Sequence, residues 1–212
     1  MCVYISLLFG HHSSAHVLVH HTHVATKQDP NTARKGESFY RYAPRAWIGS
    51  FQAGYKAEAA RLAKIERPAW HNPYWVYIGG AAVLIGAAGL LGGGKAVLIY
   101  IALCGHAQMQ LLMSDYVQHY GLRRGMTAQG KVQAVSAKHS WNSPHWLSSA
   151  MMLNATRHSD HHAHPARSYP ALTIEKDVPM LPKPLPLMAS IALLPPLWRR
   201  IMDGRVDRWQ AA

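Results

Sequence analysis

Cysteine is nearly absent from this 212-residue sequence, which contains Cys2 and Cys104 and no others. The two residues lie far apart, so they form neither a Cys-x-x-Cys pair nor a framework of disulfide bonds. Thiolate zinc sites, iron–sulfur clusters and rubredoxin-type centres each need several cysteines. These classes are therefore excluded for this chain, and any metal site must be built from histidine and carboxylate side chains.

Acidic residues are also scarce, with 10 Asp and Glu against 22 Lys and Arg, a formal net charge of +12 when histidine is neutral. A basic excess is typical of proteins that contact nucleic acid, an anionic membrane surface or acidic partners. No run of Lys and Arg alternates with stacking aromatic residues, so the sequence predicts no nucleic-acid partner. Between His71 and His119 the basic residues are reduced to Lys95 alone, a distribution that indicates a membrane protein.

Two apolar runs without charge lie in that interval, at 74–91 and 96–113. A bilayer core about 30 Å thick requires about 20 helical residues. We therefore expect an all-α integral membrane protein, a single domain over 1–212 with a transmembrane helical hairpin over about 74–118 that turns at 92–95. Because a hairpin returns the chain to the side that it left, both basic flanks are expected in the cytoplasm, as in a multi-pass protein of the cell inner membrane.

Histidine is abundant, with 15 residues, and it is densest in the stretch RHSDHHAHP at 157–165. On a helix, His158, His161 and His162 lie at i, i+3 and i+4, so their side chains share one face. Neutral imidazole is the commonest metal ligand in proteins and suits Zn, Cu, Fe and Ni. This stretch therefore predicts a metal site.

A second histidine group has similar spacing, because His16 and His20 lie one helical turn apart and His21 is adjacent. The end of the predicted hairpin brings one more candidate, which completes a set of seven: His16, His20, His21, His119, His158, His161 and His162. A structural metal takes about four ligands, so seven predict two metals. Thiolate-free histidine sites suit non-haem iron, and their place beside a membrane favours hydroxylation or desaturation of a hydrocarbon or acyl chain. Spacing does not choose between these reactions, or among iron, copper and zinc.

Five stretches resemble the membrane-bound alkane 1-monooxygenase (alkane hydroxylase) family, within the wider fatty-acid desaturase/hydroxylase superfamily. They are HVLVHHTHVATKQDPNTARKGESFYRY, SDYVQHYGLRRG, KHSWNSPHW, RHSDHHAHPARSYPAL and PPLWRRIMDGRVDRW, and they keep the order of the family. The resemblance implies a di-iron centre held by histidines and terminal hydroxylation of alkanes, with O2 as co-substrate. It also implies that a separate rubredoxin supplies the electrons.

The resemblance assigns the seven histidines to the two irons through three motifs. The second histidine box, the HYG motif and the third histidine box contain, in this order, His16, His20 and His21; His119; and His158, His161 and His162. Asp160 matches the carboxylate inside the third box, and we expect it, together with Asp115, to lie behind the ligands and orient them.

Departures from the family pattern accompany this match. The first box, which is HExxH-like, and the transmembrane helices before it are missing from the sequence. We therefore expect an N-terminally truncated or divergent form that lacks two ligands, with His11 or His12 as an alternative source. The family usually has Glu, Gly, Asn, Glu and Gln at the positions of Ala15, Val19, Asp115, Gln118 and Thr156.

Smaller segments carry further predictions. Residues 46–65 predict an amphipathic helix in the interface or the cytosol. Residues 187–198 are apolar but too short to span, so they are expected to cap the metal face or to lie in the interface. Trp141 and Trp146 are expected at the membrane interface, and Asp29–Pro30 is a turn signal.

Three competing hypotheses remain beside the alkane hydroxylase. The first is a non-catalytic membrane protein that keeps a partial metal site, and the second is a desaturase or hydroxylase of acyl lipids. The third is a soluble zinc protein. The number of irons per chain would test the first hypothesis and the products formed the second. The third requires that the chain stay in solution without detergent.

Overall fold

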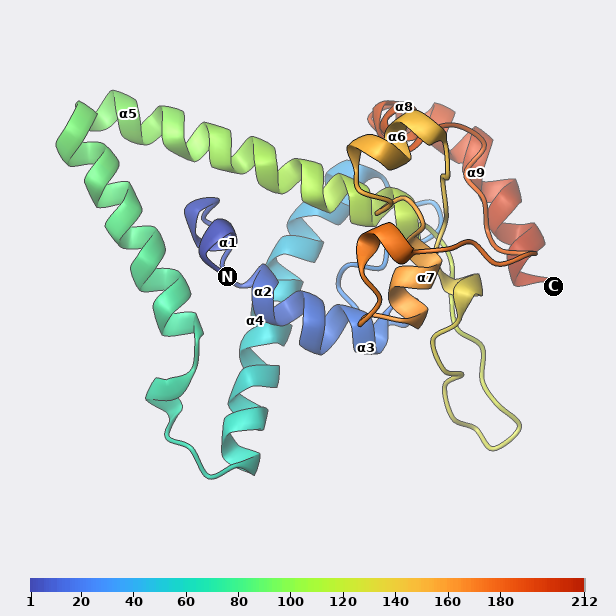
Figure 1. The fold of residues 1–212 in the computed structure, drawn as a ribbon, viewed down its shortest axis with the longest axis horizontal. Helices are drawn as coiled ribbons and strands as arrows, with labels where there is room; N and C mark the ends of the chain where they lie inside the picture. The colour runs from blue at the N-terminus through green and yellow to red at the C-terminus, as the bar shows by residue number, and fades with distance from the viewer. Residues whose placement is uncertain (212) are drawn as a thin grey trace.

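The computed structural model describes residues 1–211, which fold mainly into helices (Figure 1). The α-helices are α1 (Cys2–Ser6), α2 (His12–Ala15), α3 (His21–His23), α4 (Phe39–Lys64), α5 (Tyr74–His119), α6 (Trp146–Met151), α7 (His158–Ala163), α8 (Leu185–Ala192) and α9 (Pro195–Gln210). The π-helix η1 (His16–His20) joins α2 to α3, and three 3-10 segments are η2 (Ala69–His71), η3 (Ala137–His139) and η4 (Tyr169–Ala171). No strand forms within residues 1–211, so the all-α prediction is confirmed.

Helix α5 consists of two arms that meet at a break and open like a V (Figure 1). The break lies at Gly92 and Gly93, inside the predicted turn. Gly93 has φ 65° and ψ −165°, a backbone conformation that is essentially restricted to glycine. The second arm ends at His119, as predicted. The two arms diverge, and α1 lies between them (Figure 1).

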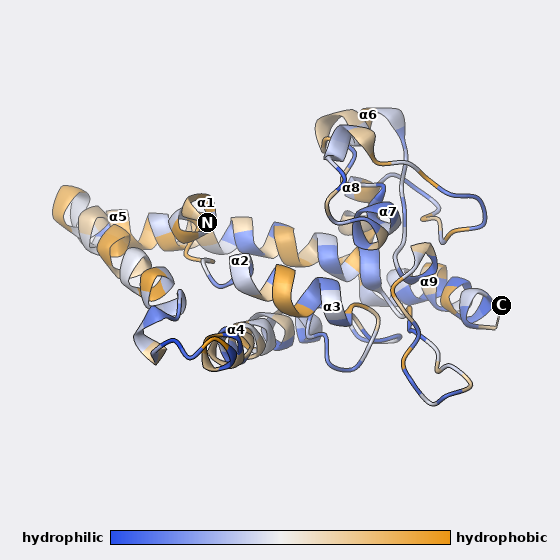
Figure 2. Ribbon diagram, turned by 60° about the horizontal axis from the view of Figure 1, so that its bottom comes forward, coloured by the Kyte–Doolittle hydropathy of each residue, from blue (hydrophilic) through white to orange (hydrophobic). Residues whose placement is uncertain are grey.

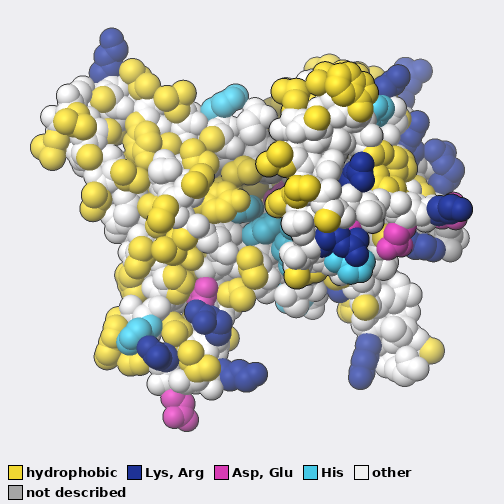
Figure 3. Space-filling model, in the orientation of Figure 1, with side chains coloured by type: hydrophobic (Ala, Val, Ile, Leu, Met, Phe, Trp, Pro, Cys, Tyr) yellow, Lys and Arg dark blue, Asp and Glu magenta, His cyan; other side chains and the backbone are white. Residues whose placement is uncertain are grey.

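The surface of α5 is strongly apolar (Figures 2 and 3). Within residues 1–211, α5 is the one helix that is long and apolar enough to cross a membrane, and no part of its most apolar 18-residue window is buried. Leu90 and Leu91, beside the break, are 91% and 90% exposed. Large contiguous apolar surfaces are rare on proteins in water, so this helix is suited to contact with lipid.

Polar contacts hold α1 and α4 to the second arm of α5. Tyr100 Oη donates to the carbonyl of Ser6 at 2.6 Å, and Gln108 Nε2 donates to the carbonyl of Leu7 at 2.7 Å. Gln108 also accepts a hydrogen bond from Trp47 Nε1 of α4 at 2.8 Å. One glutamine on α5 therefore connects three segments and fixes the N-terminal part of the chain beside the arm that ends in His119.

Helices α8 and α9 cap the end of the second arm (Figure 1). The predicted segment 187–198 forms the end of α8 and the start of α9. The ring centroid of Trp198 lies 5.4 Å from that of Tyr116 and 5.2 Å from that of Tyr120. The cap therefore packs on the end of the helix that carries His119.

Two other predictions are wrong in detail. Trp141, which was expected at the membrane interface, is completely buried. Its Nε1 donates to the carbonyl of Tyr120 at 2.8 Å and so caps the end of α5. Trp146, for which the same position was predicted, is 82% exposed. The helix predicted over residues 46–65 is α4, which begins earlier, at Phe39.

We expect Trp198→Ala to lower the free energy of unfolding by about 3–5 kcal/mol, the usual effect of truncating a buried aromatic residue. Trp198 is completely buried in the core, and its indole nitrogen has no hydrogen-bond partner within residues 1–211, so the loss comes from packing. Thermal unfolding in detergent micelles measures it. Trp146→Ala is the control and should change stability by less than about 0.5 kcal/mol. Equal shifts in the two variants would contradict the assignment of the core.

Candidate metal centre

The seven predicted histidines lie together, although they come from three separate parts of the chain. Among the described residues their side-chain nitrogens form two groups, and within each group these atoms lie within 4.8 Å of one another. We call these groups the four-histidine cluster (His20, His119, His158 and His162) and the three-histidine cluster (His16, His21 and His161).

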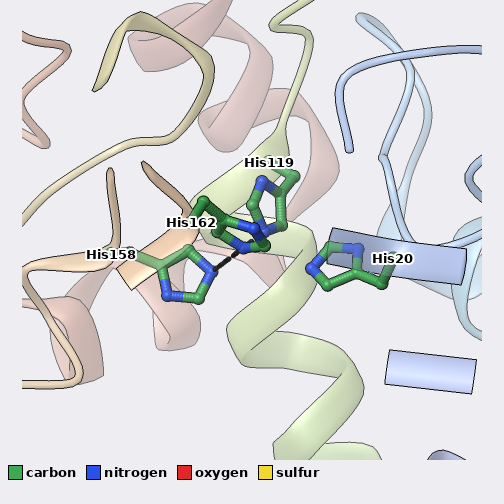
Figure 4. Close-up of side chains that lie close together, drawn as sticks. All are labelled: His20, His119, His158 and His162. Carbon is green, nitrogen blue, oxygen red and sulfur yellow. Dashed lines mark hydrogen bonds between the residues drawn. The ribbon is translucent and has the colours of Figure 1, made fainter. Parts of the chain in front are cut away.

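The four-histidine cluster lies where three helices meet (Figure 4). His20 ends η1, His119 ends α5, and α7 supplies the other two side chains one turn apart. His158 Nε2 lies 2.9 Å from His119 Nε2 and 3.1 Å from His162 Nε2. The ring centroid of His20 lies 4.7 Å from that of His119 and 4.8 Å from that of His162. All four residues are buried.

The three-histidine cluster is less buried and adjoins the first. His16 Nε2 lies 3.1 Å from His21 Nε2, and the ring centroid of His161 lies 4.8 Å from that of His21. Tyr169 stacks on the outer side of His161 with centroids 5.3 Å apart. The ring centroids of His21 and His162 are 4.6 Å apart, so the two clusters are in direct contact.

Each histidine box divides its side chains between the two clusters. The predicted common face of His16 and His20 assumed a regular α-helix, but these residues form a π-helix. Its wider turn brings His21 beside His16, while His20 joins the four-histidine cluster. Helix α7 divides in the same way, because its i and i+4 histidines join one cluster and the i+3 histidine joins the other. The three histidines of α7 share one face, as predicted, with ring centroids 4.6–5.7 Å apart, but this face contributes to both clusters.

The histidine pKa values favour neutral rings. Burial lowers the pKa of His158 and His162 well below the ordinary value, and neighbouring histidines lower it further. Burial also lowers the pKa of His21 to about 4. Burial lowers the pKa of His20 too, but the Asp29 carboxylate outweighs this effect and raises the pKa overall. Neutral imidazole is the form that binds metal, so most of this site is ready to bind without losing protons.

Asp29 is a residue of the site that sequence reasoning missed. It is buried, and His20 Nδ1 donates to its Oδ2 at 2.8 Å. Thr32 Oγ1 donates to the same oxygen at 2.6 Å, and the backbone N–H of Asn31 donates to Oδ1 at 3.0 Å. The fixed carboxylate orients the His20 ring and leaves Nε2 for the cluster, the usual role of a carboxylate behind a metal-binding histidine. The available signal was Asp29–Pro30, interpreted only as a turn.

The two predicted carboxylates contact other groups. Asp160 accepts hydrogen bonds from three partners outside both clusters: Arg167, His164 and the backbone N–H of Thr173. These bonds attach the loop after α7 to the helix. Asp115 Oδ2 accepts from Asn31 Nδ2 at 2.6 Å. Asn31 thus connects Asp115 with Asp29, and all three residues are buried.

The segment KHSWN holds α7 and the end of α5 in place. The backbone N–H and the hydroxyl of Ser159 both donate to Asn142 Oδ1, each at 3.0 Å. The backbone N–H of Asn142 donates to the carbonyl of Pro179 at 2.9 Å. Ser140 Oγ lies 3.4 Å from His119 Nδ1. Asn142 and Ser140 are completely buried, so this segment is a scaffold for histidines from both elements.

A cavity of about 130 Å³ lies beside the two clusters. Side chains from both clusters and one carboxylate are among its lining: His16, His158, His161 and Asp115. His12 also lines it and stacks on His16 with ring centroids 4.9 Å apart. Among the described residues, however, neither His12 nor His11 joins a cluster. His11 faces Ser50 Oγ at 3.3 Å instead, so of the two alternative ligands it is His12 that lies beside the three-histidine cluster.

The nitrogen positions fit metal ions. Two nitrogens on opposite sides of an ion, each bonded at about 2.1 Å, lie about 4.2 Å apart, which agrees with atoms within 4.8 Å of one another. His20 Nε2 is buried and has no hydrogen-bond partner within residues 1–211. An unsatisfied buried nitrogen costs about 1–3 kcal/mol, and coordination would remove this cost. An all-imidazole donor set suits iron, copper, zinc or nickel.

Fold and site together define a helical protein with two adjoining histidine clusters suited to metal ions and one long exposed apolar helix. The fatty acid desaturase family model matches residues 1–187 of the chain. The chain belongs to this family.

The chain is also similar to bacterial alkane 1-monooxygenases. Alkane 1-monooxygenase 1 of Alcanivorax borkumensis is 36% identical over 203 residues, which cover 95% of this chain and 50% of the relative. Alkane 1-monooxygenase 1 of Pseudomonas aeruginosa is 36% identical over 202 residues, or 92% and 52% of the two chains. Alkane 1-monooxygenase of Pseudomonas putida is 33% identical over 208 residues, or 95% and 50%. The chain spans about half the length of the curated relatives that it matches.

Proposed function

We propose that this chain is the metal-binding part of a non-haem di-iron monooxygenase that hydroxylates the terminal methyl group of alkanes. The observation that carries the proposal is the convergence of seven histidines into two adjoining clusters at the end of a long exposed apolar helix. The named relatives, which are alkane 1-monooxygenases, supply the substrate class.

The two clusters would hold one iron each. The buried four-histidine cluster offers a complete ligand set, which is typical of a closed site. The three-histidine cluster offers fewer nitrogens and borders the cavity, so its metal would keep an open position. Bound there, iron would supply the redox chemistry that activates O2 and oxidises a C–H bond. The balanced reaction consumes alkane, O2, two electrons and two protons, and it forms the alcohol and water.

The chain's own residues supply positioning and the exclusion of water. Asp29 would hold the His20 ring, and Asp160 would hold the segment that follows α7. Asp115 lines the cavity, where its carboxylate would position groups that enter beside the three-histidine cluster. The seven histidines stay neutral metal ligands in this scheme, and Asp29 orients His20 from behind.

The arms of α5 would form a transmembrane hairpin in the inner membrane, and the clusters would lie on its cytoplasmic side. The exposed apolar surface of α5 supports insertion into lipid. All basic residues except Lys95 lie outside 74–119, which supports a cytoplasmic position of the flanking segments. An apolar substrate would then reach the site from the bilayer, and a rubredoxin-type protein would supply electrons from the cytoplasm.

The test is to load the whole chain with ferrous iron in lipid nanodiscs and to supply O2, reduced rubredoxin and octane. We expect two irons per chain and octanol above the amount made by His158→Ala, which lacks one ligand of the four-histidine cluster. Iron is counted by elemental analysis and octanol by gas chromatography.

Two of the remaining hypotheses predict other outcomes in the same assay. A non-catalytic protein with a partial metal site would bind fewer than two irons and form no octanol. An acyl-lipid desaturase or hydroxylase would bind two irons, leave octane unchanged and modify fatty acyl chains. Either result would replace the alkane proposal.

A further inference from the structure

A recess of about 450 Å³ opens beside the loop that follows α3. We call it the basic recess. Its lining contains four cationic side chains from three segments of the chain: Lys27, Arg34, Arg45 and Arg123. One carboxylate, Asp29, also lines it. The recess is distinct from the cavity beside the histidine clusters, because none of the seven histidines lines it within residues 1–211.

Three of the four cations in the basic recess are free to meet a partner. Arg45 is bound to Glu37, with Nε 2.8 Å from Oε1. Lys27, Arg34 and Arg123 are exposed and form no ion pair within residues 1–211. Unpaired charges of one sign around a concave surface focus the electrostatic field and raise the rate at which oppositely charged partners arrive.

The floor of the basic recess is connected directly to the four-histidine cluster. Asp29 lines the recess, and its Oδ2 accepts the hydrogen bond of His20 Nδ1 at 2.8 Å. His20 belongs to the four-histidine cluster, with its ring centroid 4.7 Å from that of His119. A single hydrogen bond, between a carboxylate of the lining and a ring of the cluster, therefore joins the recess to the four-histidine cluster. An electron donor seated here would be separated from the cluster by one hydrogen-bonded pair.

We propose that the basic recess is the docking site of an acidic one-electron carrier protein, with Asp29 and His20 as its connection to the metal site. This inference rests on the proposed function, because it names the partner surface of the same site. At each encounter the reduced carrier is oxidised by one electron and the metal centre is reduced by one electron. Two encounters supply the two electrons of one hydroxylation.

Charge complementarity selects this occupant over others. Two of the free cations, Lys27 and Arg34, come from the loop after α3, and Arg123 follows α5. The recess that they line has a volume of about 450 Å³, larger than a single carboxylate or phosphate. A protein with several surface carboxylates can meet all three at once, and such rim charges act mainly on association rate and salt dependence. An anionic lipid surface is the competing occupant, and the test includes it as a separate arm.

The experiment compares the parent chain with the triple variant Lys27→Glu/Arg34→Glu/Arg123→Glu. The control triple variant, Lys64→Glu/Lys176→Glu/Lys183→Glu, makes the same charge change at exposed lysines outside the recess. All three chains are placed in nanodiscs of uncharged phosphatidylcholine and mixed with acidic rubredoxin. Binding is measured at low and at physiological ionic strength, and iron reduction is measured by stopped-flow spectroscopy.

We expect the recess variant to bind rubredoxin about tenfold more weakly at low ionic strength and to be reduced correspondingly more slowly. Its reduction by a small uncharged reductant and its thermal unfolding should match the parent. The control variant should retain parental affinity within about twofold.

Three results would overturn the proposal. The recess variant could bind rubredoxin like the parent, or the control variant could lose as much affinity. Alternatively, the recess variant could lose binding to phosphatidylserine vesicles while it keeps rubredoxin, which would assign the recess to lipid. Rubredoxin binding does not require iron. A chain that binds rubredoxin through the recess but forms no octanol would therefore contradict the proposed function and leave the docking site intact.

Discussion

His162→Ala is expected to reduce iron binding from two ions to one or fewer and to reduce octanol formation by more than about 100-fold. This loss exceeds the roughly 10- to 100-fold effect of changing a residue that only orients a metal ligand. His162 is the most central ring of the site. Its centroid lies within 4.8 Å of those of His20, His119 and His158. It also lies 4.6 Å from His21 of the other cluster, so its loss disturbs both proposed metal sites.

The matched control is His164→Ala, which removes an imidazole from the same end of α7. His164 is 47% exposed and binds Asp160 rather than a cluster. It should keep two irons and most of the activity. Elemental analysis, octanol yield and thermal unfolding are measured for both variants. Equal iron content in His162→Ala and the parent, in a folded chain, would show that the four-histidine cluster is not a metal site.

Asp29→Asn is expected to weaken iron binding by about 10- to 100-fold, the usual effect of changing the carboxylate behind a metal-binding histidine. The substitution keeps the size of the side chain but removes its charge. The carboxylate accepts a hydrogen bond from His20 Nδ1 at 2.8 Å, and the Asp29 side chain is completely buried. Without the charge, the His20 ring is less basic and its orientation is less strongly specified.

Asp207→Asn is the control for Asp29→Asn, because Asp207 is an exposed carboxylate on α9 that pairs with Lys35. Exposed ion pairs contribute about 0–1 kcal/mol, so this variant should bind iron like the parent. Competition with a chromophoric chelator measures both affinities. If Asp29→Asn also retains parental affinity, the hydrogen bond to His20 has no role in metal binding.

The identity of the histidines could be predicted from sequence, because each box has helical spacing and thiolate ligands are absent. The break in α5 was also predictable, since Gly92 and Gly93 interrupt two apolar runs. The grouping of the ligands was not predictable. It depends on the π-helix at His16–His20 and on the angle at which α7 meets the end of α5. Neither feature leaves a local signal in the sequence.

The carboxylates show the same limit. Asp160 lies inside a histidine box and was expected to orient a ligand, yet its partners are Arg167, His164 and Thr173. Asp29 lies in an apparent turn, yet it binds His20. Proximity in sequence was a poor guide, because the chain reverses after α3 and brings the turn back onto the cluster. Trp141 was misplaced for a related reason, since its polar atom caps a helix end that lies far away in sequence.

The sequence by itself determined the helical class, the apolar helix with its glycine break, and the seven imidazoles as the available donors. These features follow from local periodicity and from composition, which each segment expresses without its neighbours. The tertiary structure alone decided the division of the imidazoles into four and three, the choice of Asp29 as the supporting carboxylate, and the position of the basic recess above it. These features depend on contacts between segments far apart in the chain, and the packing of α5, α7 and the loop after α3 sets those contacts.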